Sequence, residues 1–173
     1  RFDGGDVVAI VDGVETRRAA ASVTGLVISA GGRVTLPAYA GVPITVTAAG
    51  SLAVGGSGLV WSTDGAGGGS VAGVAFSGVG ELVADGTGVL AGPSADTTWR
   101  VTGAGSGVAG AQAFRGFSAL IGAAGGDDTF IVSSSGSIDL VDGGAGGYDT
   151  LGFDGDQGAV TSRPTGPQSG TIV

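Results

Sequence analysis

The chain has 173 residues, of which 39 are glycine and 42% are hydrophobic, and its formal net charge is −8. It contains no cysteine, histidine or lysine, which removes disulfides, thiolate metal sites, the usual general base and the Schiff-base amine. The negative charge argues against a nucleic-acid partner, because phosphate binding needs a cationic surface. Carboxylates and hydroxyls are the main reactive groups left, so we expect no enzymatic activity.

The chain shows no signal for membrane insertion. No apolar run approaches the roughly 18 residues of a membrane-spanning helix, and no charged-then-apolar signal segment opens the chain. The sequence begins with Arg1 and stops within a strand-like segment, residues 170–173. We therefore expect a section of a longer polypeptide or a processed product.

The first sixty residues contain a short internal repeat. Residues 1–20 carry short apolar runs and are expected to form an N-terminal strand, cap or linker region. In the next segment, 21–60, apolar and polar residues alternate between glycine turns, as in β-strands. Here residues 26–36 are echoed 18 positions later by 44–54. We expect two stacked windings of about 18 residues, because a repeat unit buries its apolar face only against the next one.

A longer repeat follows in residues 61–122. Five positions recur at a spacing of 38, namely Trp61, Gly73, Phe76, Gly78 and Leu82 as Trp99, Ala111, Phe114, Gly116 and Leu120. Because 38 is twice 19, we expect each of these two units to contain windings of about the same length as before. We expect the aromatic residues to fill the core, and the alternative is a stacking platform for sugars.

No segment has the pattern of a helix. A 3.6-residue apolar stripe never persists beyond about two turns, and each glycine in a helix would cost about 1 kcal/mol. The predicted fold class is all-β, a parallel β-helix or β-solenoid with windings of about 18–21 residues.

The C-terminal segment, 123–173, is rich in aspartate and glycine. Seven of the 13 aspartates lie between positions 127 and 156. The sequence GGDDTF at 125–130 is followed by the similar sequence GGYDTL at 146–151. Each copy is a glycine-rich turn followed by aspartate, threonine and a large apolar residue. This pattern resembles the nonapeptide repeat of RTX, or haemolysin-type, calcium-binding proteins.

The resemblance implies a calcium site. In such repeats the glycine-rich turn exposes backbone carbonyls and the aspartate completes the oxygen shell that Ca²⁺ prefers. The candidate ligands are five carboxylates, those of Asp127, Asp128, Asp142, Asp149 and Asp154. A strand-like segment separates the two copies, so a shared ion requires a whole winding to bring the turns together. The alternative is that these turns only cap the corners of a β protein.

Residues 60–156, with their tryptophan and phenylalanine motifs leading into the aspartate turns, are similar to segments of very large bacterial surface proteins and adhesins built from β-strand repeats. The resemblance implies secretion, a cell-surface or extracellular position and a structural or adhesive role. The implied partners are like subunits or neighbouring repeats of the same polypeptide, with a surface glycan as a further candidate.

The predicted function is a structural repeat module of a filament, surface layer or adhesin stalk, stiffened by calcium. One alternative is a glycan-binding module that uses exposed aromatic residues such as Tyr39 or Tyr148. A second alternative is a polysaccharide-degrading β-helix enzyme, in which two carboxylates would act as acid and base. Its candidates are Asp127, Asp128, Asp149 and Asp154, but the region lacks the basic and aromatic residues of sugar subsites.

Overall fold

The computed structural model describes residues 24–37, 43–48 and 50–155, and outside these ranges it gives only strand bounds. The outer strands are β1 (Phe2–Asp3), β2 (Asp6–Val11), β3 (Val14–Ala19), β18 (Ser162–Gly166) and β19 (Ser169–Ile172). The expected N-terminal region, residues 1–20, and Tyr39 therefore lie outside the described residues. In the described part every regular element is a strand, which confirms the all-β prediction there. That part has no helix long and apolar enough to cross a membrane.

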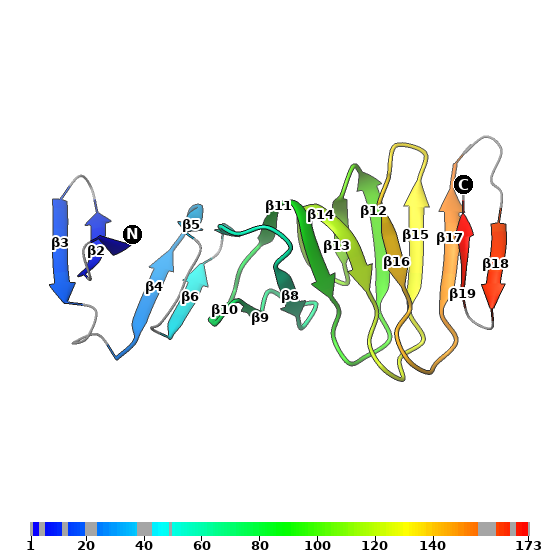
Figure 1. The fold of residues 1–173 in the computed structure, drawn as a ribbon, viewed down its shortest axis with the longest axis horizontal. Coiled ribbons are helices and arrows are strands. Elements are labelled where there is room, and N and C mark those ends of the chain that lie inside the picture. The colour runs from blue at the N-terminus through cyan, green and yellow to red at the C-terminus, as the bar shows by residue number, and fades with distance from the viewer. Residues whose placement is uncertain are drawn as a thin grey trace.

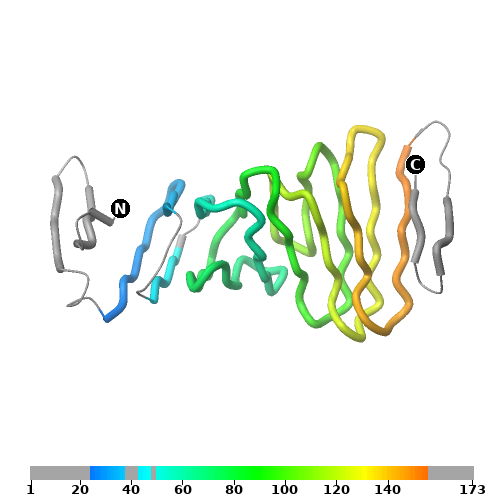
Figure 2. The backbone as a smooth tube through the Cα atoms, in the orientation of Figure 1, coloured from blue at the N-terminus to red at the C-terminus, as the bar shows by residue number. Residues whose placement is uncertain are grey.

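The described strands form one mixed sheet of 14 strands that does not close on itself. They are stacked along the long axis of the described body, from β4 at one end to β17 at the other (Figure 1), and the backbone trace in Figure 2 follows the same path. The strands are β4 (Leu26–Ala30), β5 (Val34–Leu36), β6 (Ile44–Ala48), β7 (Ser51–Val54), β8 (Val60–Thr63), β9 (Gly69–Val71), β10 (Val74–Ser77), β11 (Glu81–Ala91), β12 (Thr98–Gly103), β13 (Ser106–Ala109), β14 (Gln112–Ile121), β15 (Thr129–Ser133), β16 (Leu140–Asp142) and β17 (Thr150–Asp154).

The shorter repeat is confirmed as a pair of neighbours in space. Strand β4 pairs in parallel with β6, and β5 pairs in parallel with β7. This register places Ile28 opposite Val46 and Val34 opposite Leu52. Because successive side chains of a strand point to opposite faces, Val46 is fully buried whereas the preceding Thr45 is exposed.

The longer repeat is also present, but each unit is built differently from the prediction. Strands β8, β9 and β10 form an antiparallel meander, and β12, β13 and β14 form a second one. The two are equivalent, since Trp61 pairs with Val71 in the first, and the corresponding residues Trp99 and Ala109 pair in the second. The expectation that each unit consists of two parallel windings is therefore wrong in this segment.

The glycine-rich stretches explain the difference. They form tight turns between antiparallel strands, and not the corners of parallel windings. In the turn between β8 and β9, Oδ1 of Asp64 accepts the backbone amides of Ala66 and Gly68, both at 2.8 Å. An aspartate that binds the backbone ahead of it stabilises a local turn. The chain therefore reverses direction here.

Parallel pairing continues past the meanders at longer spacings along the chain. Leu90 of β11 lies opposite Trp61 of β8 on one side and Leu120 of β14 on the other. Near the C-terminal end the spacing is shorter again, because Phe130 of β15 lies opposite Leu151 of β17. The predicted spacing between stacked strands is therefore found at the two ends of the described sheet. In the middle, the extra strands of the meanders lengthen the chain between parallel neighbours.

A row of six aromatic rings in mutual contact runs through the core. In order of contact the rings are Phe76, Trp61, Phe117, Phe114, Trp99 and Phe130. None of them is more than 4% exposed. The equivalent pairs Trp61–Phe76 and Trp99–Phe114 both have ring centroids 6.3 Å apart. The prediction that these residues fill the core is confirmed, and their burial excludes them as a platform for sugars.

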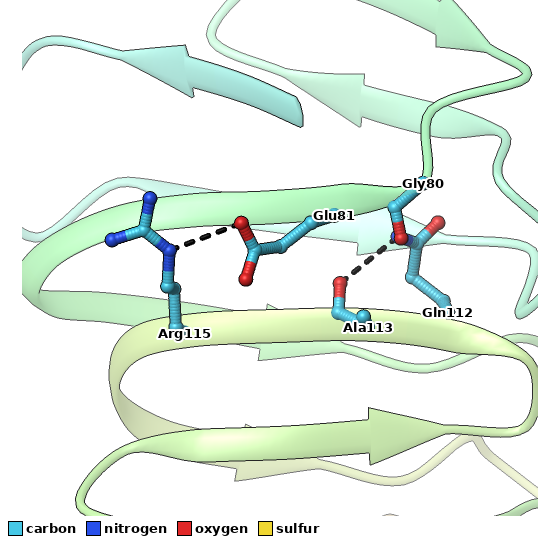
Figure 3. A network of polar contacts seen from close by, with 5 residues as sticks. All are labelled: Gly80, Glu81, Gln112, Ala113 and Arg115. Carbon is cyan, nitrogen blue, oxygen red and sulfur yellow. Dashed lines mark hydrogen bonds and ion pairs between the residues drawn. The ribbon is translucent and has the colours of Figure 1, made fainter. Parts of the chain in front are cut away.

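Polar contacts connect the two longest strands, β11 and β14 (Figure 3). The buried Gln112 stands where the first unit has Val74, and its Nε2 donates to the carbonyls of Gly80 at 3.2 Å and Ala113 at 3.0 Å. Further along the strands, Nε of Arg115 donates to Glu81 at 3.0 Å. This pair is partly exposed, so it is worth less than about 1 kcal/mol. Gln112 therefore links the start of β14 to the turn that precedes β11.

The pairing of β11 with β14 is interrupted by a register shift between Val83 and Gly88. Between these residues, Oδ1 of Asp85 accepts the hydroxyl of Thr87 at 2.7 Å and the backbone amide of Thr87 at 3.0 Å. The same hydroxyl oxygen accepts the amide of Gly58 at 2.7 Å. The hydrogen bonds from Thr87, the hydroxyl first and the amide second, lower the pKa of Asp85 below its ordinary value of 3.8.

We expect a carboxyl NMR titration to give Asp85 a pKa below 3.8. The Thr87→Val variant should raise this pKa toward the ordinary value, whereas Thr87→Ser keeps the hydroxyl and should leave it low. Because the folded-state pKa is lowered, the stabilisation is present above the unfolded-state pKa and is lost as the pH falls through the folded-state pKa. An Asp85 pKa unchanged in Thr87→Val would contradict this account.

Candidate functional site

The candidate site is a set of three turns at the C-terminal end of the described sheet, which we call the turn stack. Its members are residues 92–97, 122–128 and 143–149. They follow strands β11, β14 and β16, and they precede β12, β15 and β17. Parallel pairing of the latter three strands places Trp99 opposite Phe130 and Phe130 opposite Leu151. The turns that carry Asp128 and Asp149 are therefore adjacent in space, which is the condition for the two turns to form one site.

Backbone hydrogen bonds join the second and third turns directly. The amide of Gly122 donates to the carbonyl of Asp142 at 2.7 Å, and the amide of Gly125 donates to the carbonyl of Ala145 at 2.9 Å. These contacts continue the parallel pairing of the strands into the turns. The two turns therefore meet backbone to backbone.

Two series of side-chain hydrogen bonds, which we call columns, connect the three turns. The first column runs from the first turn to the third. Oδ1 of Asp96 accepts the backbone amide of Asp127 at 2.9 Å. Oδ1 of Asp127 in turn accepts the amide of Tyr148 at 2.8 Å. In this column each carboxylate binds the turn that follows it in the chain.

The second column runs in the opposite direction. Oδ1 of Asp128 accepts the amide of Thr97 at 2.9 Å, and Oδ1 of Asp149 accepts the amide of Asp128 at 2.9 Å. The other oxygen of Asp128 accepts the amide of Ala123, also at 2.9 Å, within its own turn. Asp128 has no exposed surface. Both of its oxygens therefore have partners, as a buried carboxylate requires.

Two glycines make room for these carboxylates. A Cβ at Gly122 would collide with Oδ2 of Asp128, and a Cβ at Gly143 would collide with Oδ2 of Asp149. Each glycine stands at the same distance before its aspartate in the chain. The spacing of glycine and aspartate in both copies therefore has a steric cause.

The remaining two predicted ligands lie apart from these columns. Oδ1 of Asp142 accepts the amide of Gly144 at 2.9 Å within its own turn. Asp154 lies at the end of β17, opposite Ser133 of β15. In the described ranges, no group of three or more acidic side chains is arranged to hold a metal ion.

The donor set of the turn stack does not fit a calcium ion. Because Ca²⁺ takes about 6–8 oxygen ligands, several carboxylate or carbonyl oxygens must point at one position. Here the oxygens of Asp128 point at two N–H groups, and one oxygen of Asp149 points at a third. An N–H group presents positive charge where a cation would lie. The calcium prediction stays a prediction, but these contacts do not support it.

Asp96 and Thr97 belong to the turn stack and were missed by the sequence interpretation. The signal was the sequence Asp96-Thr97-Thr98-Trp99, which matches residues 127–130 of the second copy in its first acid, its threonine and its aromatic residue. The first turn is one residue shorter between its glycine, Gly92, and the position equivalent to Asp128. A comparison at a fixed spacing therefore does not align it.

Comparisons with protein-family models, curated proteins and solved structures find no match to this chain.

Proposed function

We propose that the chain is a section of β-solenoid and that it serves as a structural repeat module of a secreted bacterial surface protein. The observation that carries the proposal is the parallel, in-register stacking of similar residues. Ile28 lies opposite Val46 near one end, and Phe130 lies opposite Leu151 near the other. A stack of this kind becomes longer along one axis with each added repeat, as a spacer or stalk requires.

The end strands support a role in assembly. The main strand order ends at β4 and β17, and the described strands β5 and β16, which lie off this path, also pair on one side only. In β17, Leu151 and Phe153 are 38% and 39% exposed, whereas Phe130 and Val132, their neighbours in β15, are only 1% and 8% exposed. End strands of a sheet are templates for further pairing. The partner that we propose for this end is a like subunit or a neighbouring repeat of the same polypeptide.

The location of the module rests on resemblance. Residues 60–156 are similar to the β-strand repeats of bacterial surface proteins, and these are exported. The proposed location is the bacterial cell surface or the extracellular space.

Assembly can be tested by particle size. We expect light scattering and negative-stain electron microscopy of the whole chain to show elongated particles that lengthen with concentration. Phe153→Glu places a charge on the exposed apolar end and should shift the distribution toward single chains. Val60→Glu adds the same charge at a residue that is 61% exposed on β8, a strand with partners on both sides, and it should assemble like the wild type. Wild-type chains that stay single at the highest concentration would refute the assembly role.

A second candidate function, glycan binding, is favoured by one observation. Tyr148 of the third turn is 88% exposed, and an exposed aromatic ring is a surface on which a sugar can stack. A glycan array probed with wild type and Tyr148→Ala tests this alternative. Loss of a signal in the variant supports it, and a signal that persists excludes Tyr148 as the contact.

A further inference from the structure

The hydrogen bonds of the turn stack follow a reciprocal rule. Between the first and second turns, Asp96 of the first turn accepts an amide of the second, and Asp128 of the second turn accepts an amide of the first. Between the second and third turns, Asp127 and Asp149 repeat the same two contacts. Each interface therefore has two carboxylate-to-amide bonds of opposite direction.

We propose that these paired bonds, and not a divalent cation, hold the three turns together. An ionised carboxylate that accepts an amide proton forms a charge-assisted bond, roughly twice as strong as a neutral one. The bonds at Asp128 are also shielded, because this residue has no exposed surface. The carboxylate thus does for the turn stack what calcium does in the repeats that it resembles.

The rule also accounts for the residues at the two ends of the stack. An acid at the position of Thr97 would bind a turn before the first, and an acid at the position of Tyr148 would bind a turn after the third. Neither residue is acidic. The positions of the acidic residues therefore limit this series of carboxylate-to-amide hydrogen bonds to three turns.

Thermal unfolding of the whole chain tests the proposal, with millimolar CaCl₂ or with EDTA. We expect the same Tm in both. Asp128→Asn should lower Tm by roughly 5–10 °C, because its amide group turns a donor toward the amide of Thr97 or Ala123. Asp142→Asn is the matched control, since Asp142 lies outside the two columns and its amide oxygen can still accept from Gly144, and its Tm should change by less than about 2 °C.

Two results would overturn the proposal. One is a calcium-dependent rise in the wild-type Tm that is absent in Asp128→Asn, because this would make Asp128 a ligand. The other is an Asp128→Asn variant as stable as the wild type. If that variant does not fold, hydrogen exchange of the wild-type chain in EDTA tests the same hydrogen bonds. Slow exchange at the amides of Thr97 and Asp128 supports the proposal, and fast exchange refutes it. These outcomes are independent of whether the chain assembles.

Discussion

Replacing Trp99 by alanine is expected to lower the free energy of unfolding by about 3–5 kcal/mol, as for other large buried aromatic residues. Trp99 is fully buried between Phe114 and Phe130, whose ring centroids lie 6.3 and 5.3 Å from its own. Truncation would leave a cavity in the aromatic row at the point where the second meander meets β15. Equilibrium unfolding in denaturant measures the loss.

Two variants show whether the loss comes from packing. Within the described residues, Nε1 of Trp99 has no hydrogen-bond partner. Trp99→Phe removes this unpaired donor and keeps a ring, so its cost should be less than half that of the alanine variant. Tyr148→Ala truncates an aromatic residue that is 88% exposed and should change stability by less than about 0.5 kcal/mol. Equal losses in Trp99→Phe and Trp99→Ala would contradict the packing account.

The second large effect is expected for Gly107→Ala, a loss of about 3 kcal/mol from overpacking. Gly107 lies in β13, and a Cβ there would collide with the carbonyl oxygen of Arg100 on the neighbouring strand. The equivalent residue of the first meander, Gly69, has the same relation to the carbonyl of Ser62. Because the obstacle is backbone, it cannot rotate away. Denaturant unfolding is again the measurement.

Gly31→Ala provides the matched control for this variant. A Cβ at Gly31 meets nothing within 4 Å, and the residue does not have the positive φ that favours glycine. Its stability should stay within about 0.5 kcal/mol of the wild type. A Gly107→Ala variant as stable as Gly31→Ala would show that the two meander strands can separate without cost.

The part of the fold that could be predicted from the sequence is the part where like residues pair directly. Alternation around Val46 and Leu52 indicates which side chains are buried, and the spacing of the shorter repeat indicates which strand lies next. Both follow from the period of a strand and the need of a repeat to cover its neighbour.

The meanders could not be predicted by the same argument. The spacing of the longer repeat fits two parallel windings, and it fits equally a three-stranded antiparallel unit. Trp61 and Trp99 are core residues in either arrangement, so their recurrence does not decide between them. The direction of each strand depends on turns such as Asp64–Gly68, where local hydrogen bonds reverse the chain.

The equivalence of the two aspartate turns could be predicted from the sequence, but their contacts could not. The recurrence of Asp128 as Asp149 correctly indicates equivalent turns, and the structure makes them neighbours. Their partners are backbone amides of adjacent turns, which have no signature in the sequence. Asp96 escaped notice because the first turn is one residue shorter.

The two meanders also have a consequence for the order in which the chain acquires its structure. Trp61 meets Val71 on the very next strand, whereas it meets Leu90 only after β9 and β10 have both been passed. Closing a shorter loop costs less entropy, and structure rich in local contacts forms faster. We expect each meander to form early in folding. The parallel strands that are distant in the sequence then pair with the edge of a meander that has already formed.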